Sequence, residues 1–201
     1  SSSSAASDVY KRQPLFGSKK TRKVVAADFV YSFDRLRNKK IASPGGWVMQ
    51  QVNDYEAKEK HVLTIRLKNP FPAFLGLLTM RYCAVVPMEI TSHYGEDFRS
   101  NPIGTGPFYF KQWDENVKLV LRKNPKYFEI DEQGQRLPYL DAVAIEFIPD
   151  IQSEFMLFLQ GKFDFINSLD SSYKDELLTP KGKIQTKYRD QLNMLKGPYL
   201  N

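Results

Sequence analysis

The sequence is poor in cysteine and histidine, which excludes several kinds of site. Cys83 is the only cysteine among 201 residues, so neither an intramolecular disulfide nor a multi-thiolate metal site can form. The two histidines, His61 and His93, are far apart in the chain and lack the paired spacing of zinc hydrolases. We therefore predict no metal site and no cofactor, and we interpret Cys83 as a small buried apolar residue.

The sequence also lacks a long apolar run. No segment approaches the roughly 18 apolar residues that a membrane-spanning helix needs. The start of the chain has no basic segment followed by an apolar one, so no signal peptide is visible. Residues 1–13 begin with four serines and differ abruptly in composition from the rest of the chain. We expect these residues to be a non-native or disordered tail that takes no part in the fold.

The positive charge is concentrated at one end of the chain. Residues 1–23 contain six lysines and arginines against one aspartate, whereas the other 178 residues contain 23 basic and 22 acidic residues. Because most of the chain is nearly neutral, the net charge of +6 does not indicate a nucleic-acid surface. We therefore predict no nucleic-acid partner.

The hydrophobic pattern predicts an α/β protein with short elements. A hydrophobic content of 42% and an aromatic content of 13% are sufficient for a folded core. Helical spacing of apolar residues predicts helices over 26–37, 73–80, 87–94 and 151–160. Alternating or short apolar runs predict strands over 61–68, 83–86, 108–113, 117–122 and 163–166, and a further strand carrying Val143, Ile145 and Phe147 on one face. Asn53 and Asp54 are predicted to form a polar turn, and Asp150 to cap the last helix.

The most constrained stretch reads Asn-Pro-Ile-Gly-Thr-Gly-Pro-Phe-Tyr-Phe over residues 101–110. Proline fixes φ and glycine permits positive φ, so the composition predicts a tight, rigid turn that leads into a strand. A Gly-Thr-Gly element can also cradle a phosphate, but such a loop opens a helix. Here Pro107 and an alternating aromatic run follow instead, and we interpret the stretch as a structural turn.

Four segments of the chain match motifs in a constant linear order. Residues 24–36 follow the pattern V-T-A-x-D-x-x-Y-S-x-x-R-L, with Val25 in place of threonine, and residues 101–109 with 119–128 follow N-P-x-G-T-G-P-F/Y and R-N-x-x-Y/F. Residues 137–143 follow L-P-Y-L-D-x-V/I, and residues 161–164 follow G-x-I/F-D. Together these segments resemble the family 5 extracellular solute-binding proteins of bacteria, over roughly residues 20–201.

The resemblance implies a fold and a function. The implied fold is a mixed-sheet α/β lobe of a two-lobed, periplasmic-binding-protein-like fold, which is incomplete: residues 14–201 would form part of the first lobe, and the second lobe would be absent. The implied function is that of the substrate-binding component of an ABC importer, which captures short peptides by closing two lobes around them without catalysis. The implied partners are a peptide or similar small solute and the permease and ATPase subunits. The implied protein is a monomer, periplasmic or extracytoplasmic, with a lipoprotein anchor in its full-length form.

Two alternatives stay open at this point. A receptor of the same fold for a sugar or a metal chelate is not excluded, because the resemblance implies that the ligand is chosen by residues that are not present in this chain. An α/β hydrolase would need a nucleophile next to a base, and the sequence shows no such pair, so we predict no catalytic residue.

Two places are candidates for a ligand surface. Asn167, Ser168 and Leu169 follow a predicted strand, where backbone groups are not all used internally. The resemblance favours these three residues, because the corresponding segment of the family runs beside the cleft between the lobes; an ordinary loop and helix cap is the alternative. The resemblance also points to Tyr199 near the chain end, which could equally be a packing residue.

Overall fold

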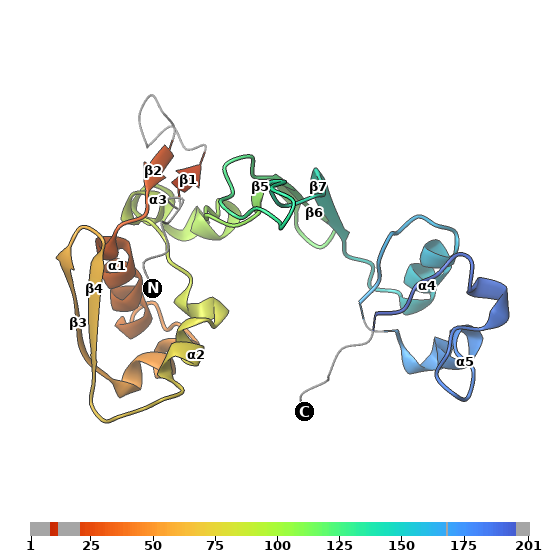
Figure 1. The fold of residues 1–201 in the computed structure, drawn as a ribbon, viewed down its shortest axis with the longest axis horizontal. Coiled ribbons are helices and arrows are strands. Elements are labelled where there is room, and N and C mark those ends of the chain that lie inside the picture. The colour runs from red at the N-terminus through yellow and green to blue at the C-terminus, as the bar shows by residue number, and fades with distance from the viewer. Residues whose placement is uncertain (1–8, 12–20, 168, 196–201) are drawn as a thin grey trace. The chain divides into compact units, whose positions relative to one another are not determined.

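The computed structural model describes residues 9–11, 21–167 and 169–195 (Figure 1). The chain divides into two units, Ser1–Ile145 and Glu146–Asn201. Strand β1 falls within the stretch that we expected to lie outside the fold; the rest of that stretch, residues 1–8 and 12–13, lies outside the described residues.

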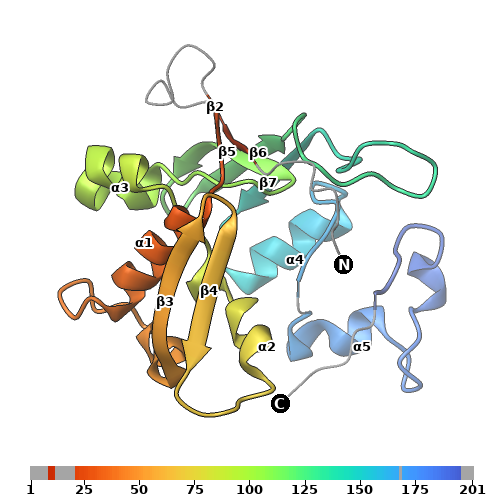
Figure 2. The same ribbon diagram turned by 60° about the vertical axis from the view of Figure 1, so that its left-hand side comes forward.

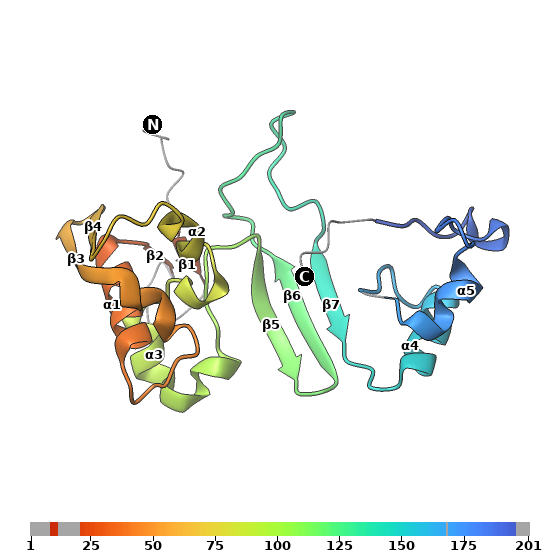
Figure 3. The same ribbon diagram turned by 90° about the horizontal axis from the view of Figure 1, so that it is seen from below.

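The first unit combines short helices with three small sheets. Its helices are α1 (Ala26–Arg37), α2 (Phe74–Leu78) and α3 (Met88–Tyr94), with the 3-10 helices η2 (Gly46–Gln51), η3 (Arg81–Cys83) and η4 (Gly95–Ser100). Its strands are β1 (Val9–Lys11), β2 (Thr21–Lys23), β3 (Val52–Glu59), β4 (Val62–Leu67), β5 (Phe108–Asp114), β6 (Lys118–Lys123) and β7 (Ala142–Glu146). Strands β1 and β2 pair antiparallel, as do β3 and β4, and the third sheet has the order β5-β6-β7 (Figure 3).

The core of the first unit lies between α1 and the β3–β4 hairpin (Figure 2). Phe33 of α1 is 2% exposed, and its ring meets the ring of Tyr55 of β3 edge-on, with centroids 5.3 Å apart. Val48 of η2 and Val52 of β3 are fully buried in the same cluster. The helical spacing of apolar residues in α1 is therefore explained by one face of the helix packing on the hairpin.

Strand β3 and the segment around Cys83 correct the sequence predictions. The expected turn at Asn53 and Asp54 is wrong, because both residues lie within β3, where Arg66 of β4 bonds to Asp54 and Glu56 at 2.6 and 2.9 Å. Cross-strand ion pairs thus support a strand that lacks apolar alternation. The strand expected over 83–86 is also wrong, because residues 81–83 form η3 through local bonds such as the one from the Cys83 N–H to the Met80 carbonyl (2.9 Å).

The other elements that the sequence predicted in the first unit lie close to their predicted positions. Helices α1 and α3 begin and end within one residue of the expected limits, and α2 is a shortened form of the expected helix. Strands β5 and β6 form the expected antiparallel hairpin, with a three-residue loop over 115–117 in which Asn116 has a positive φ of 59°. Strand β7 is present, but the expected apolar face is exposed at Ile145 (41%) and at Phe147 just beyond it (43%).

The turn before β5 is held by hydrogen bonds from a residue outside the turn, Asn124. Gly104 and Gly106 do not have positive φ, and a Cβ at either position would meet nothing within 4 Å, so the expected role of glycine here is wrong. Asn124, 2% exposed, holds the turn instead: its Nδ2 donates to the Gly106 carbonyl (2.8 Å), and its backbone N–H donates to the Pro107 carbonyl (2.7 Å). The turn leads into strand β5 and opens no helix, which agrees with a structural turn.

We expect Asn124→Ala to lower the free energy of unfolding by about 2 kcal/mol, because the carbonyl of half-buried Gly106 loses its donor and the Lys126 N–H loses its acceptor, 3.1 Å away. Urea unfolding followed by tryptophan fluorescence would measure this change. Asn53→Ala is the matched control: Asn53 is exposed, so its loss is expected to cost less than about 0.5 kcal/mol. Equal losses for the two variants would contradict the anchoring role of Asn124.

The second unit contains α4 (Ile151–Leu159), η5 (Ser171–Tyr173), α5 (Lys174–Leu177) and η6 (Thr186–Tyr188). Asp150 caps α4 as predicted, accepting from the Ser153 N–H at 2.7 Å, and Gly161 follows the helix with a positive φ of 70°. The strand predicted over 163–166 is wrong. Among the described residues no strand lies beside that segment to pair with it, so its apolar alternation produces no sheet.

Candidate functional site

The predicted ligand residues fall only partly within the described chain. Asn167 is exposed in a bend, and Leu169 is half-buried two residues later. Among the described residues, the Asn167 side chain has no hydrogen-bond partner. Ser168 and Tyr199 lie outside the described residues, so whether Tyr199 approaches the 167–169 segment stays a prediction.

The segment that follows these residues is anchored. Asp170 Oδ1 accepts from the Ser172 N–H at 2.8 Å and from the Ser172 hydroxyl at 2.5 Å, and these hydrogen bonds lower the pKa of Asp170. The Tyr173 ring stacks on the buried Phe155 ring of α4, with centroids 4.1 Å apart and an angle of 15°. Residues 170–173 therefore form a helix cap and a packing contact, whereas Asn167 is exposed.

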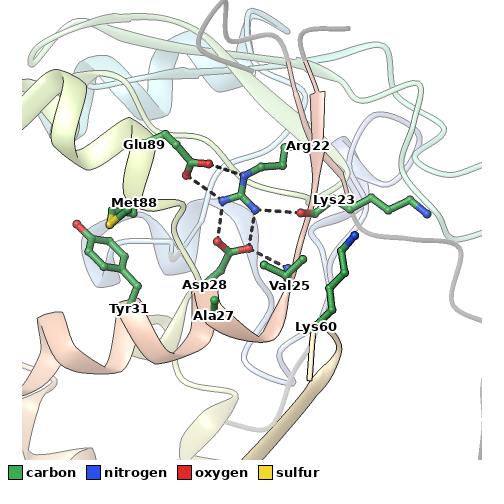
Figure 4. A pocket seen from close by; sticks show the side chains of 9 residues that line it. All are labelled: Arg22, Lys23, Val25, Ala27, Asp28, Tyr31, Lys60, Met88 and Glu89. Atoms are coloured by element: carbon green, nitrogen blue, oxygen red, sulfur yellow. Dashed lines mark hydrogen bonds and ion pairs between the residues drawn. The ribbon is translucent and has the colours of Figure 1, made fainter. Parts of the chain in front are cut away.

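A second candidate is an open concavity of about 640 Å³ in the first unit (Figure 4). It lies among β2, α1, α3 and the turn between β3 and β4. Its lining is Arg22, Lys23, Val25, Ala27, Asp28, Tyr31, Lys60, Met88 and Glu89. Three of these side chains are basic and two are acidic, so an anion site is the first possibility to test.

The guanidinium of Arg22 is already fully used within the chain (Figure 4). Its Nη1 donates to the Lys23 carbonyl and to Asp28 Oδ2, both at 3.0 Å, and its Nη2 donates to Asp28 Oδ1 (2.7 Å) and Glu89 Oε2 (2.9 Å). Its Nε lies 2.7 Å from Glu89 Oε1. Four of the five guanidinium N–H donors therefore make hydrogen bonds, and the fifth, on Nε, lies within ion-pair distance of Glu89. The bonds to Asp28 raise the pKa of Arg22 further above its usual value, so Arg22 joins β2, α1 and α3 and is not free to bind an anion.

The N-terminus of α1 is also occupied. Val25, at the cap position, has no hydroxyl to cap the helix, because valine stands where the motif has threonine. The Asp28 carboxylate compensates by accepting the Val25 N–H at 2.9 Å, and the Ala26 N–H donates to the Lys60 carbonyl at 2.9 Å. An acidic residue three positions into a helix is the sequence signal for such a bond. With a carboxylate already at the helix end, the concavity is a structural junction and not an anion site.

The histidines, the cysteine and the acidic residues of the described ranges form no metal site. Within these ranges, no three or more histidine, cysteine or acidic side chains form a group that could hold a metal ion. His61 lies in the turn between β3 and β4, whereas His93 lies in α3 beside Tyr94. Cys83 is buried, as predicted; its Sγ donates to the Leu77 carbonyl at 3.6 Å, and burial raises the pKa of its thiol. No helix in the described ranges is long and apolar enough to cross a membrane.

Comparison of the sequence with known proteins finds similarity to solute-binding proteins. The family model described as bacterial extracellular solute-binding proteins, family 5 Middle, matches residues 21–197. The oligopeptide-binding protein AppA of Bacillus subtilis is 27% identical over 160 residues, which are 76% of this chain and 28% of AppA. The glutathione-binding protein GsiB of Salmonella typhimurium is 26% identical over 128 residues, which are 64% of this chain and 24% of GsiB.

Comparison with solved structures shows that the fold is that of a binding protein. The periplasmic binding protein DppA from Helicobacter pylori, in complex with the peptide STSA, superimposes with a TM-score of 0.71 at 21% identity, covering 84% of this chain and 35% of DppA. The α/β class and the partial, two-lobed binding-protein fold are therefore confirmed. The chain spans between 24% and 35% of the length of these three relatives.

Proposed function

Because the chain belongs to the family 5 bacterial extracellular solute-binding proteins, as the match over residues 21–197 shows, we propose that it is part of the substrate-binding component of an ABC importer that captures short peptides. The family match carries this proposal. It is supported by the names of the relatives, which bind oligopeptides or glutathione, and by the peptide held in the DppA structure.

The proposed mechanism is capture by enclosure. Residues 14–201 contribute part of a first lobe, and the complete polypeptide supplies a second lobe that closes over the ligand. Asn167, Ser168, Leu169 and Tyr199 contribute to the ligand surface. The exposed, unpartnered amide of Asn167 offers both a donor and an acceptor, which suits the backbone of an extended peptide. No covalent step is involved, and the protein is not an enzyme.

The proposed setting follows from the same function. The complete protein acts as a periplasmic or extracytoplasmic monomer, held at the membrane by a lipoprotein anchor. It delivers the peptide to the permease and ATPase subunits of the importer. The description of the family as extracellular supports this location.

The proposed function is tested by a ligand screen on the complete polypeptide. We expect isothermal titration calorimetry to detect short peptides, and Asn167→Ala to weaken their binding about tenfold, because one or two hydrogen bonds to the peptide backbone are lost. Asn193→Ala, which changes another exposed asparagine of the second unit, is expected to leave the affinity unchanged. Binding of a sugar or a metal chelate in place of peptides would contradict the peptide assignment and favour a different receptor of the same fold.

A further inference from the structure

The turn that joins α1 to η2 carries positive charge without compensation. From residue 35 to residue 53 the sequence has four basic residues and no acidic one. Two of the four, both arginines, are used internally. The Arg35 guanidinium lies over the Phe98 ring, 5.8 Å from its centroid, and the Arg37 Nη2 donates to the Val52 carbonyl at 2.6 Å.

The other two basic residues, Lys39 and Lys40, are exposed. Neither ammonium group has a partner within the described part of the chain. The backbone N–H of Lys40 donates to Asn38 Oδ1 at 2.9 Å, so this bond fixes the path of the chain and leaves the side chain free. Two unpaired positive charges therefore stand next to each other in the turn.

Two large apolar side chains accompany these lysines. Ile41 is 41% exposed and Trp47 is 45% exposed. The residues after Trp47 explain why the indole stays outside: Val48 (0% exposed) and Met49 (3% exposed) enter the core and fix the start of η2. The turn thus combines point charges with an exposed indole and an exposed aliphatic side chain.

The turn is held in one position against the unit. A Cβ at Gly45 would lie 2.3 Å from the Tyr82 Cβ, and a Cβ at Gly46 would lie 2.8 Å from the Leu36 carbonyl oxygen, so the backbone runs in close contact with η3 and α1. The Gly46 N–H donates to the Ser43 carbonyl at 3.0 Å. Figure 2 shows the turn extending from the end of α1 away from β3 and β4. Its exposed side chains are therefore presented by an ordered backbone.

We propose that this basic turn, residues 38–47, binds the anionic headgroups of a phospholipid surface. Lys39 and Lys40 would contact lipid phosphates, while Ile41 and Trp47 enter the region between headgroups and acyl chains, where indole rings and lysine side chains are favoured. The positive charge of the turn is complementary to such a surface, and indole rings are enriched where a membrane meets water. Lipid binding at this turn does not depend on which solute the protein carries, so its failure would leave the proposed transport function intact.

The experiment uses the 201-residue chain and vesicles that contain brominated lipid. In a Trp113→Phe background Trp47 is the only tryptophan, so bromine quenching of its fluorescence reports contact at this turn. We expect quenching with vesicles of phosphatidylglycerol and phosphatidylcholine, and none with phosphatidylcholine alone. We expect the quenching to fall steeply at about 0.5 M salt, because exposed charges are screened. Lys39→Gln with Lys40→Gln is expected to weaken the partitioning about 25-fold, roughly fivefold for each lysine.

The controls separate this turn from other sources of binding. Lys181→Gln with Lys183→Gln makes the same charge change at exposed lysines of the second unit and should leave the quenching unchanged. The basic residues 1–23 could bring the chain to vesicles by themselves. Co-sedimentation without quenching of Trp47 would show that they do, and would overturn the proposal. Quenching that survives loss of Lys39 and Lys40, or blue-shifting of Trp47 by polyglutamate but not by vesicles, would overturn it as well.

Discussion

The isolated 201-residue chain is expected to bind short peptides at least about 1,000-fold more weakly than the complete polypeptide does. The reason is enclosure, since a ligand site of the proposed kind buries most of the ligand, and in this proposal the chain supplies only part of one of the two enclosing lobes. On an open surface the polar groups of a peptide stay hydrated. The few contacts it makes there do not offset the loss of translational and rotational freedom. Calorimetric titration of both proteins with the same di- to pentapeptides measures the ratio.

An unfolded chain would also bind poorly, so the comparison needs evidence of folding. Both tryptophans, Trp47 and Trp113, lie in the first unit, and a cooperative urea transition in their fluorescence shows that this unit is folded. Peptide affinities of the isolated chain and the complete polypeptide that agree within tenfold would contradict the proposal that two lobes enclose the ligand. They would place the whole ligand site within residues 1–201.

Arg22→Met is expected to lower the free energy of unfolding of the first unit by about 3 kcal/mol. Removing the guanidinium leaves the carboxylate of Asp28, whose side chain is 6% exposed, without its cation. A broken buried ion pair costs about 3–5 kcal/mol, and we take the low end because Arg22 is 26% and Glu89 is 40% exposed. Tryptophan fluorescence during urea unfolding measures the loss.

A double-mutant cycle and a matched control test the cause. Adding Asp28→Asn to Arg22→Met removes the unpaired negative charge of Asp28. The double variant is therefore expected to lose less free energy of unfolding than the two single variants lose in sum. Arg66→Met likewise removes an arginine that pairs with two carboxylates, those of Asp54 and Glu56. All three of these side chains, however, are 44–50% exposed. Water replaces those contacts, and we expect a much smaller loss. Similar losses for Arg22 and Arg66 would show that burial of Asp28 is not the source of the effect.

How much of the fold could be predicted depends on the range of the interactions involved. Helix α1 follows from the spacing of Phe29, Phe33 and Leu36, and the cap of α4 follows from Asp150, because these signals lie within a few residues. Strand β3 was missed because its support comes from Arg66 of the neighbouring strand. The strand expected over 163–166 was predicted from alternation alone, but a strand also needs a partner to pair with.

The same contrast between short-range signals and long-range contacts applies to the candidate site. The loop that contains Asn167 is predicted to bind ligand from its small polar residues after an apolar run; Asn167 is exposed there, and its contact with a ligand stays a prediction. The concavity near Arg22 was not found, because nothing in the sequence places Glu89 beside Arg22. Only the pattern of an acidic residue at the start of α1, Asp28, pointed to part of that cluster.

The sequence by itself determined the family, the order of the motifs and most helix limits, since motif identity and apolar spacing are properties of consecutive residues. Only the tertiary structure decided which polar groups are free and which are used. Arg22 reaches Glu89 across 67 positions, and Asn124 reaches Gly106 across 18. Such bonds form because folding brings distant donors and acceptors together away from water, where leaving them unpaired is costly. They turn Arg22 into a structural link, whereas the side chains of Lys39, Lys40 and Asn167 have no such partner among the described residues.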